Sequence, residues 1–439
     1  MQLIGENYIH SNFQESGTKY RSLAGNVQRD QDQADPHAKP SRSDARLTLG
    51  TITWVIVIST LPIHKLITSF TGLYTYLVLG LIVALFAFGK FARPAGAAIW
   101  AACVPFIVIA SILSGIYSSV SRSLLVGLQL AIVVGLAPFV LRYYVNKSEK
   151  FTKYALAGFV TVQTLSSIAG LVQLTGAPVF GMVANSGRAN GLATHPNILG
   201  LMAALAILIC LTTTFKTQGR IRFLVVCTVG VNFAALIGSG SLSSLLSFAG
   251  GTAVLLVASR ATFRTIAIAA VASVALAAGG AIIGLEYSIL TETVEGRVNT
   301  VTGVSNDGVA SVSIRQATYA FAMESIQNDP LSGVGMDSAN QGTYNGTTVV
   351  HNYLLRSWYQ GGILLFISLA LITGFLAYRV IKAIAKGIDA LPAAVVTTII
   401  IFALTSAFYT QQQYWLPIML AVAHLITAPS KLHVGASER

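Results

Sequence analysis

The sequence predicts an all-α polytopic membrane protein with about twelve transmembrane helices, and three observations lead to that fold class. The 439 residues have a mean hydropathy of +0.68 and only 10% of them are charged, which excludes an ordinary soluble globular protein. The apolar residues form twelve runs, each close to the roughly 20 residues that cross hydrocarbon as a helix. Basic residues occupy every second connection between these runs, as membrane topology requires.

The predicted spans follow one another along most of the chain. An even number of spans places both basic tails on the cytoplasmic side. The seventh and eighth spans are short, so they form either two crossings or a shallow hairpin around a water-filled cavity. The predicted ranges are 48–70, 73–89, 95–117, 122–141, 153–175, 196–215, 221–238, 241–258, 264–285, 352–378, 391–410 and 413–429.

Five segments follow from this layout. A polar tail without a sustained apolar run is predicted to be disordered and cytoplasmic. It contains Asp30 and Asp32 in an Asp-x-Asp pattern, but no strand or apolar context of a metal-binding glycosyltransferase surrounds them. The segments are the tail at 1–46, nine helices in 47–285, one large extracytoplasmic loop with short helices at 286–351, three helices in 352–429 and a cytoplasmic tail at 430–439.

The charge and the cysteines exclude two further classes. The net charge of +12 is spread over the cytoplasmic connections instead of forming one patch with aromatic residues, so no nucleic-acid partner is expected. Cys103, Cys210 and Cys227 all lie inside apolar runs and lack metal-ligand spacing, so we interpret them as core residues. No metal and no cofactor are predicted.

Six basic residues lie on the opposite side from the rest. Of the 28 Lys and Arg residues, all but six fall in the tails or the cytoplasmic connections. Cations at the outer ends of spans, beside apolar surface, are costly and require an explanation such as an anionic ligand. We interpret Lys65 and Arg122 as interfacial anchors. The six are Lys65, Arg122, Arg188, Arg297, Arg315 and Arg356.

The first motif that could carry chemistry spans residues 187–200 and enters the sixth span from the outer face. Pro196 suits the first helical turn, where its missing N–H costs nothing. The helix start is expected to direct free N–H groups at an anion, and Arg188 to add a bidentate donor for phosphate. A capped helix with a snorkelling arginine is the structural alternative. For His195 neither a functional nor a structural role is favoured.

The second motif, residues 349–356, enters the tenth span in the same orientation. His351 is a candidate general base near neutral pH. Asn352 either caps the helix, holds the His351 tautomer or binds a sugar hydroxyl. Arg356 lies one turn further and faces either the same cavity or the lipid headgroups.

The large outer loop contains seven acidic residues and two of the six cations. Residues 313–328 have helical periodicity, with Ile314, Ala317, Tyr319, Ala320, Phe321 and Ile326 on one face. Asp329 and Pro330 are predicted to end that helix, and the glycines that follow mark turns. Arg297 and Arg315 either contact phosphate or sugar or pair with a neighbouring carboxylate.

These motifs resemble the O-antigen ligase and polymerase family of bacterial polysaccharide assembly. The family pattern has an Arg, a Gly and Pro-Asn-x-x-Gly entering a middle span, followed by a large outer loop with an Arg on a helix, a Pro-x-x-Gly-x-Gly turn and a closing His-Asn. The resemblance is concentrated in residues 187–362. The matching residues are Arg188, Gly191, Pro196, Asn197 and Gly200, then Arg315, Pro330, Gly333, Gly335, His351 and Asn352.

The resemblance implies a fold, an activity and a location. The fold is the membrane glycosyltransferase (GT-C-like) type. The activity is inverting, metal-independent transfer of a glycan from an undecaprenyl-diphosphate carrier to an acceptor hydroxyl, the acceptor being a glycan for a polymerase or a lipid for a ligase. The protein would lie in the bacterial cytoplasmic membrane with its site facing the periplasm. Arg188 and His351 would be catalytic, and Arg297, Arg315, Arg356, Asn197 and Asn352 would hold the diphosphate or sugar.

The chain departs from the family pattern at one turn. Many family members carry Ser-Arg-Gly between the seventh and eighth spans, whereas residues 238–243 here contain no arginine.

The alternative class is a transporter or flippase of lipid-linked saccharide or solute, which predicts charge near the middle of the bilayer. Apart from Lys65, the predicted spans have almost no such charge. A structural scaffold would leave both outer motifs unexplained.

Overall fold

The computed structural model confirms a helical polytopic membrane protein. It describes residues 42–116, 118–193, 195–214, 217–260, 309–337, 344, 348–406, 408 and 410–425. The chain divides into two compact units, Met1–Ile52 and Thr53–Arg439, and the contacts below concern the second. Within the described residues, seven helical runs are long and apolar enough to cross a membrane: Leu49–Thr71, Ala97–Gly115, Val120–Lys147, Lys150–Leu174, Pro196–Thr213, Gly219–Gly238 and Tyr353–Lys386.

The first half of the chain follows the predicted spans with two local irregularities. A 3-10 turn at Pro62, whose ring nitrogen has no N–H to donate, interrupts the first span, and a π-helical turn lies within the fourth. The elements are α2 (Arg42–Thr60), η1 (Leu61–Ile63), α3 (His64–Thr71), α4 (Tyr74–Ala87), α5 (Ala97–Gly115), α6 (Val120–Ala131), η2 (Ile132–Leu136), α7 (Ala137–Lys147) and α8 (Glu149–Leu174).

The second half contains helices of more variable length. The predicted ninth span, 264–285, lies outside the described residues, so the count of twelve stays a prediction. The last two helices are shorter than the spans predicted for them. The elements are η3 (Gly191–Ala193), α9 (Pro196–Thr214), α10 (Gly219–Gly238), α11 (Leu242–Ala258), α14 (Val309–Asn328), α15 (Tyr353–Lys386), α16 (Ala390–Ala403) and α17 (Gln412–His424).

The possible shallow hairpin of the seventh and eighth spans is not what the structure shows. Helix α10 packs mainly against α9 and α8, whereas α11 packs mainly against α16 and α9. The two helices therefore separate after their connecting turn, and α10 is long enough to cross a membrane by itself. Ser241 begins α11, because its side chain accepts a hydrogen bond from the N–H of Ser244.

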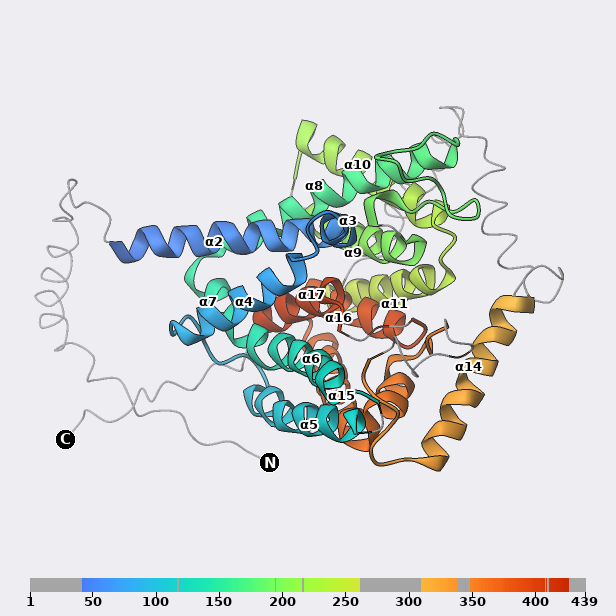
Figure 1. Cartoon of the computed structure of the whole chain (residues 1–439). Coiled ribbons are helices and arrows are strands. Elements are labelled where there is room, and N and C mark those ends of the chain that lie inside the picture. The colour runs from blue at the N-terminus through green and yellow to red at the C-terminus, as the bar shows by residue number, and fades with distance from the viewer. Residues whose placement is uncertain are drawn as a thin grey trace, which may run out of the picture. The chain divides into compact units, whose positions relative to one another are not determined.

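Helix α9 is the most enclosed of the candidate spans, and its N-terminus carries the first motif. It contacts α8, α10, α11 and α16, which Figure 1 shows around it. Nearly every side chain from Leu199 to Cys210 is buried. A helix packed on all sides is a rigid support, so whatever its first turn holds is fixed relative to the bundle.

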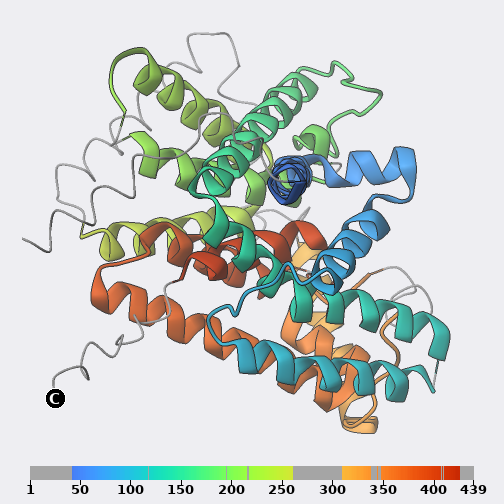
Figure 2. The ribbon, with the colours of Figure 1, turned by 90° about the vertical axis from the view of Figure 1, so that its left-hand side faces the viewer.

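Helix α15 brings the second motif to the outer loop. It lies beside α5, as Figure 2 also shows, and α14 packs against it. The contact with α14 buries Ala322 and Ile326 against Val350 and Tyr359. The predicted helix at 313–328 is confirmed, but its predicted face is partly wrong. Ile326 is buried as predicted, but Ala320 is exposed, and Thr318 and Ala322 are buried in its place, since residues four apart share one helix face with Ile326.

Candidate functional site

Arg188 is held in a defined position between two helix ends. Its Nε donates to the carbonyl oxygen of Ser239 at 2.8 Å, and its Nη2 donates to Oδ1 of Asn197 at 2.7 Å. The next residue, Ala189, donates its N–H to the carbonyl oxygen of Gly238 at 2.9 Å. The guanidinium is therefore fixed against the turn between α10 and α11, and Asn197 is placed as its support.

This turn is where many family members carry an arginine that the chain lacks. Arg188 reaches the same turn from another segment and brings a guanidinium to Ser239. Gly200 makes the approach of α9 possible, because an added Cβ would lie 2.7 Å from Oγ of Ser239 and 2.8 Å from Oγ of Ser244. The glycine of the Pro-Asn-x-x-Gly pattern is thus a close-packing residue.

The segment that carries Arg188 is attached to α8 by a buried glutamine. Oε1 of Gln173 accepts the N–H groups of Asn190 and Gly191, at 3.2 and 2.9 Å, and its Nε2 donates to the Gly191 carbonyl. Gly191 has φ +56°, and a Cβ there would lie 2.4 Å from the carbonyl oxygen of Ser166. Only glycine fits at this position, which explains why the motif has a glycine there.

The free N–H groups expected at the start of α9 are not free. Pro196 does begin the helix, as predicted. The N–H of Asn197 donates to Nδ1 of His195 at 3.2 Å, and the N–H groups of Ile198 and Leu199 donate to the His195 carbonyl oxygen, each at 3.1 Å. His195 thereby caps this helix. Because the first N–H groups of α9 are already bonded, an anion at this helix start would contact side chains and not backbone amides.

The two polar residues of the second motif have different environments: Asn352 caps a helix, and the ring of His351 is partly buried. Oδ1 of Asn352 accepts the N–H groups of Leu354 and Leu355, both at 3.1 Å, so Asn352 caps α15. The carbonyl oxygen of His351 accepts a hydrogen bond from the Tyr319 hydroxyl of α14 at 3.1 Å. Nδ1 of His351 is buried and has no hydrogen-bond partner among the described residues.

Arg356 is buried within the protein instead of facing the headgroups. Only 5% of its surface is exposed, and its Nε donates to Oε1 of Gln360 at 2.9 Å. Of the two orientations that the sequence allowed, the structure therefore selects the interior one. Its charge acts on His351 from one helical turn away.

The turn after α14 is built into a break of α15. The N–H groups of Val334 and Gly335 donate to the carbonyl oxygens of Tyr359 and Gln360, each at 3.0 Å. Those carbonyls can accept bonds from the loop because the backbone leaves the helix at Gly362, with φ +70° and ψ −173°. The Pro-x-x-Gly-x-Gly turn therefore docks into the tenth predicted span and fixes α14 above it.

We expect Gly362→Ala to detach this turn. An alanine Cβ would lie 2.0 Å from the Leu331 carbonyl oxygen, in a backbone conformation that only glycine adopts readily. The strain is on the order of 2 to 3 kcal/mol, and the melting temperature of the purified protein should fall by roughly 5 °C. Gly374→Ala, on the same helix with nothing within 4 Å, is the matched control and should melt like the wild type. Equal melting of both variants would contradict the docking.

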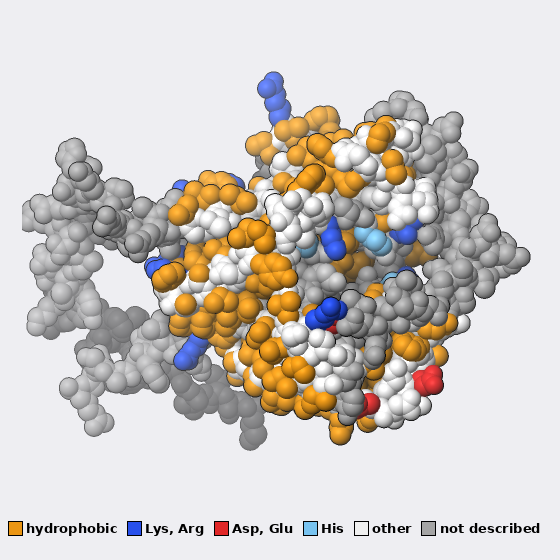
Figure 3. All heavy atoms as spheres, viewed as in Figure 1, with side chains coloured by type: hydrophobic (Ala, Val, Ile, Leu, Met, Phe, Trp, Pro, Cys, Tyr) orange, Lys and Arg blue, Asp and Glu red, His pale blue; other side chains and the backbone are white. Residues whose placement is uncertain are grey.

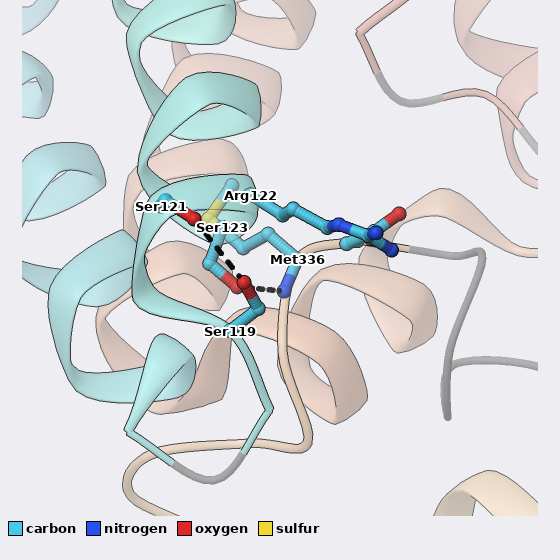
Figure 4. Close-up of polar contacts among 6 residues, drawn as sticks. Ser119, Ser121, Arg122, Ser123 and Met336 are labelled. Atoms are coloured by element: carbon cyan, nitrogen blue, oxygen red, sulfur yellow. Dashed lines mark hydrogen bonds and ion pairs between the residues drawn. The ribbon is translucent and has the colours of Figure 1, made fainter.

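The loop is also attached to the start of α6. The N–H of Met336 donates to Oγ of Ser123 at 3.1 Å, and Nη1 of Arg122 lies 3.5 Å from Oδ2 of Asp337 (Figure 4). The Arg122 side chain is 60% exposed, so this ion pair contributes little stability by itself. Arg122, which the sequence assigned to the membrane interface, pairs with a loop carboxylate.

Cations converge on the two histidines of the motifs. Partial burial lowers the pKa of His195 below its ordinary value, and the charges of Arg188, His351 and Lys65 lower it further. Burial also lowers the pKa of His351; Arg315 lowers it further, the backbone of Val349 opposes this shift and Arg356 adds to it. Among the described residues, every charged side chain that acts on these histidines is basic. Figure 3 shows Lys, Arg and His side chains gathered around a hollow on one face.

The structure thus brings together most of the residues singled out in the sequence. Arg188, Arg315 and Arg356 act on the same pair of histidines, Asn197 holds Arg188, and Asn352 caps α15 beside His351. Arg297 lies outside the described residues. Lys65, predicted to be an interfacial anchor, is exposed, and its charge also reaches His195. Its place among the six predicted outward cations was the sequence signal for this interaction.

No metal ligands accompany this cluster in the part of the chain that the structure describes. Three or more His, Cys, Asp or Glu side chains do not come together anywhere in those residues. The arrangement is a positively charged recess with two histidines and two amide side chains. Its chemistry suits an anion at the arginines and a proton transfer at a histidine.

The comparisons with known proteins agree with the resemblance seen in the motifs. The family model described as O-antigen ligase matches residues 223–370, about one third of the chain. The match includes Arg315, His351, Asn352 and Arg356 and ends before α16, while Arg188 and Asn197 precede it. A comparison with curated proteins finds no match. The chain is therefore a polytopic membrane protein whose residues 223–370 match the O-antigen ligase family model.

Proposed function

We propose that the protein transfers a glycan from an undecaprenyl-diphosphate carrier to an acceptor hydroxyl on the outer face of the bacterial cytoplasmic membrane. One observation carries the proposal: Lys65, Arg188, Arg315 and Arg356 all act electrostatically on the pair His195 and His351. Like charges brought together repel each other, so the cluster favours an anionic ligand. A diphosphate at headgroup depth has the charge and the position to meet it, and the O-antigen ligase match supports a lipid-linked glycan as its source.

The proposed reaction is a direct displacement with inversion. The acceptor oxygen forms a bond to the anomeric carbon as the bond from that carbon to the diphosphate oxygen breaks. The bonding electron pair leaves with the diphosphate, where Arg188 stabilises the developing charge. The acceptor proton passes to a ring nitrogen of His351. Because the arginines supply the positive charge, the step requires no metal. Because the donor is the carrier-linked glycan, it requires no nucleotide sugar.

The remaining residues have supporting roles in this proposal. Arg315 lies on α14 and Arg356 on α15, so they approach His351 from two elements and would contact the diphosphate or the first sugar. Asn197 holds Arg188, and Asn352 fixes the start of α15 beside the base. Arg297 is proposed as a further phosphate contact from the outer loop. The fold is proposed to be of the GT-C-like membrane glycosyltransferase type.

The decisive experiment uses proteoliposomes that contain the purified protein and an undecaprenyl-diphosphate-linked oligosaccharide. We expect release of undecaprenyl diphosphate together with a glycan joined to an added acceptor. A second carrier-linked repeat as the effective acceptor identifies a polymerase, and a lipid core identifies a ligase. Movement of intact donor across the vesicle without release would overturn the proposal in favour of a transporter.

The pH dependence of transfer follows from the two lowered pKa values. A base acts in its deprotonated form, and His351 is held deprotonated to a lower pH than an ordinary histidine with pKa about 6.5. The pH at which the rate at low donor concentration falls to half its maximum should therefore lie below 6.5. A rate that already falls by half near pH 7.5 would contradict a lowered pKa of the base. Initial rates between pH 5 and pH 8 provide the test.

A further inference from the structure

An apolar cavity lies at the opposite end of the bundle from the charged recess. It has a volume of about 60 Å³ and is lined by residues of α2, α8, α9, α16 and α17, among them Ile58, Leu156, Leu205, Leu391 and His424. Thr152, near the start of α8, also lines it, whereas Gln173, near the other end of α8, holds the Arg188 segment. Those 21 residues of helix correspond to about 32 Å, the thickness of the hydrocarbon region.

The lining excludes water as the natural occupant. Thr152 and His424 are the two polar side chains in it, and they hydrogen-bond to each other, with 2.8 Å between Oγ1 and Nε2. A buried water needs two to four polar partners, and an apolar cavity without them stays dry or takes an apolar ligand. The volume corresponds to roughly four to six groups of the size of a methylene. The cavity therefore matches a short stretch of hydrocarbon chain.

The charges around this end indicate what carries that chain. Arg142 donates to the carbonyl oxygen of Ala423 and acts electrostatically on His424. Exposed lysines follow along α7 and α8 at Lys147, Lys150 and Lys153, the last of them next to Thr152. Asp389 also acts on His424, and Asp389 and Glu149, the first residue of α8, are acids at this end. The excess of basic groups favours an anionic headgroup beside the cavity.

We propose that this cavity binds the headgroup-proximal part of one acyl chain of an anionic phospholipid, whose headgroup lies on the basic residues at the start of α8. The ligand comes from the leaflet at the Arg142 and Lys153 end of the bundle. The inference is independent of the proposed transfer reaction, because its residues and the diphosphate site lie at opposite ends of α8.

A matched pair of substitutions on α8 tests the site. Leu156 faces the cavity, whereas Leu165 lies on the same helix with 57% of its surface exposed. After delipidation, native mass spectrometry with added phosphatidylglycerol should show one retained lipid for the wild type and for Leu165→Trp. Retention by Leu156→Trp should fall at least tenfold, because the indole fills the cavity. Equal retention by both variants would overturn the proposal.

A second measurement uses the wild type alone and does not depend on how the variants fold. Phosphatidylglycerol with a photoreactive diazirine near the ester end of its acyl chain should label peptides of α8, α16 and α17 that line the cavity. Competition by undecaprenyl phosphate that removes the label, but not by unlabelled phosphatidylglycerol, would assign the cavity to the tail of the carrier and overturn the phospholipid assignment. Labelling spread evenly over exposed helix faces would show the cavity to be no binding site.

Discussion

Replacing Arg188 with alanine is expected to lower the turnover number of glycan transfer by about 1,000-fold, the upper range for losing a donor that stabilises developing negative charge. Arg188 is anchored by Ser239 and Asn197, so its guanidinium meets the diphosphate without reorganising. Arg188→Lys should recover only a small part of the activity, because an ammonium group cannot form the bidentate contact. The release of undecaprenyl diphosphate by purified variants measures the effect.

The matched control is another outward arginine. Arg122 is mostly exposed and pairs with Asp337 across 3.5 Å, so Arg122→Ala should change the turnover less than threefold. Circular dichroism and the melting temperature establish that Arg188→Ala retains its fold, which matters because the bond to Ser239 also joins two segments. Polymer or ligation product formed at the wild-type rate by folded Arg188→Ala would remove Arg188 from the mechanism.

Replacing His351 with glutamine is expected to have the second-largest effect. The turnover number should fall by about 100-fold, which is the low end of the range for losing a general base. The loss is smaller than for Arg188 because diphosphate is a good leaving group, which lowers the demand on the base. The fall in rate below pH 6.5 should disappear in His351→Gln, since the titrating group has gone. Initial rates between pH 5 and pH 8 again provide the measurement.

His195→Gln is the control for this assignment. His195 also has a lowered pKa, but its Nδ1 caps α9 by accepting the N–H of Asn197. The variant should keep the fall below pH 6.5, with a lower maximal rate. If the fall disappears in His195→Gln and persists in His351→Gln, the base is His195 and the two roles must be exchanged.

The helices were predictable to the extent that they depend on local sequence. Apolar length, Pro196 at a helix start and Asn352 as a cap each act within one or two turns, and all appear where the sequence placed them. The face of α14 was harder to predict. Periodicity in a weakly apolar helix does not say which of two small residues is covered, and packing against α15 buries Ala322 while Ala320 stays exposed.

The candidate site was predictable as a set of residues but not as a set of contacts. The six outward cations followed from topology alone, and they included every cation that now acts on His195 or His351. The support of Arg188 by Ser239 and Asn197, and of its segment by Gln173, joins residues from three helices. Sequence spacing contains no information about such distant partners.

By itself, the sequence determined that this protein is a helical membrane protein, and it predicted unusual cations at the outer face, because hydropathy and charge position are local properties that the bilayer imposes. The tertiary structure alone decided which cations share a site. It separated Arg122, paired with Asp337, from Lys65, whose charge reaches His195. The physical reason is that electrostatic interaction depends on distance through space, which only the packing of α3, α9, α14 and α15 sets.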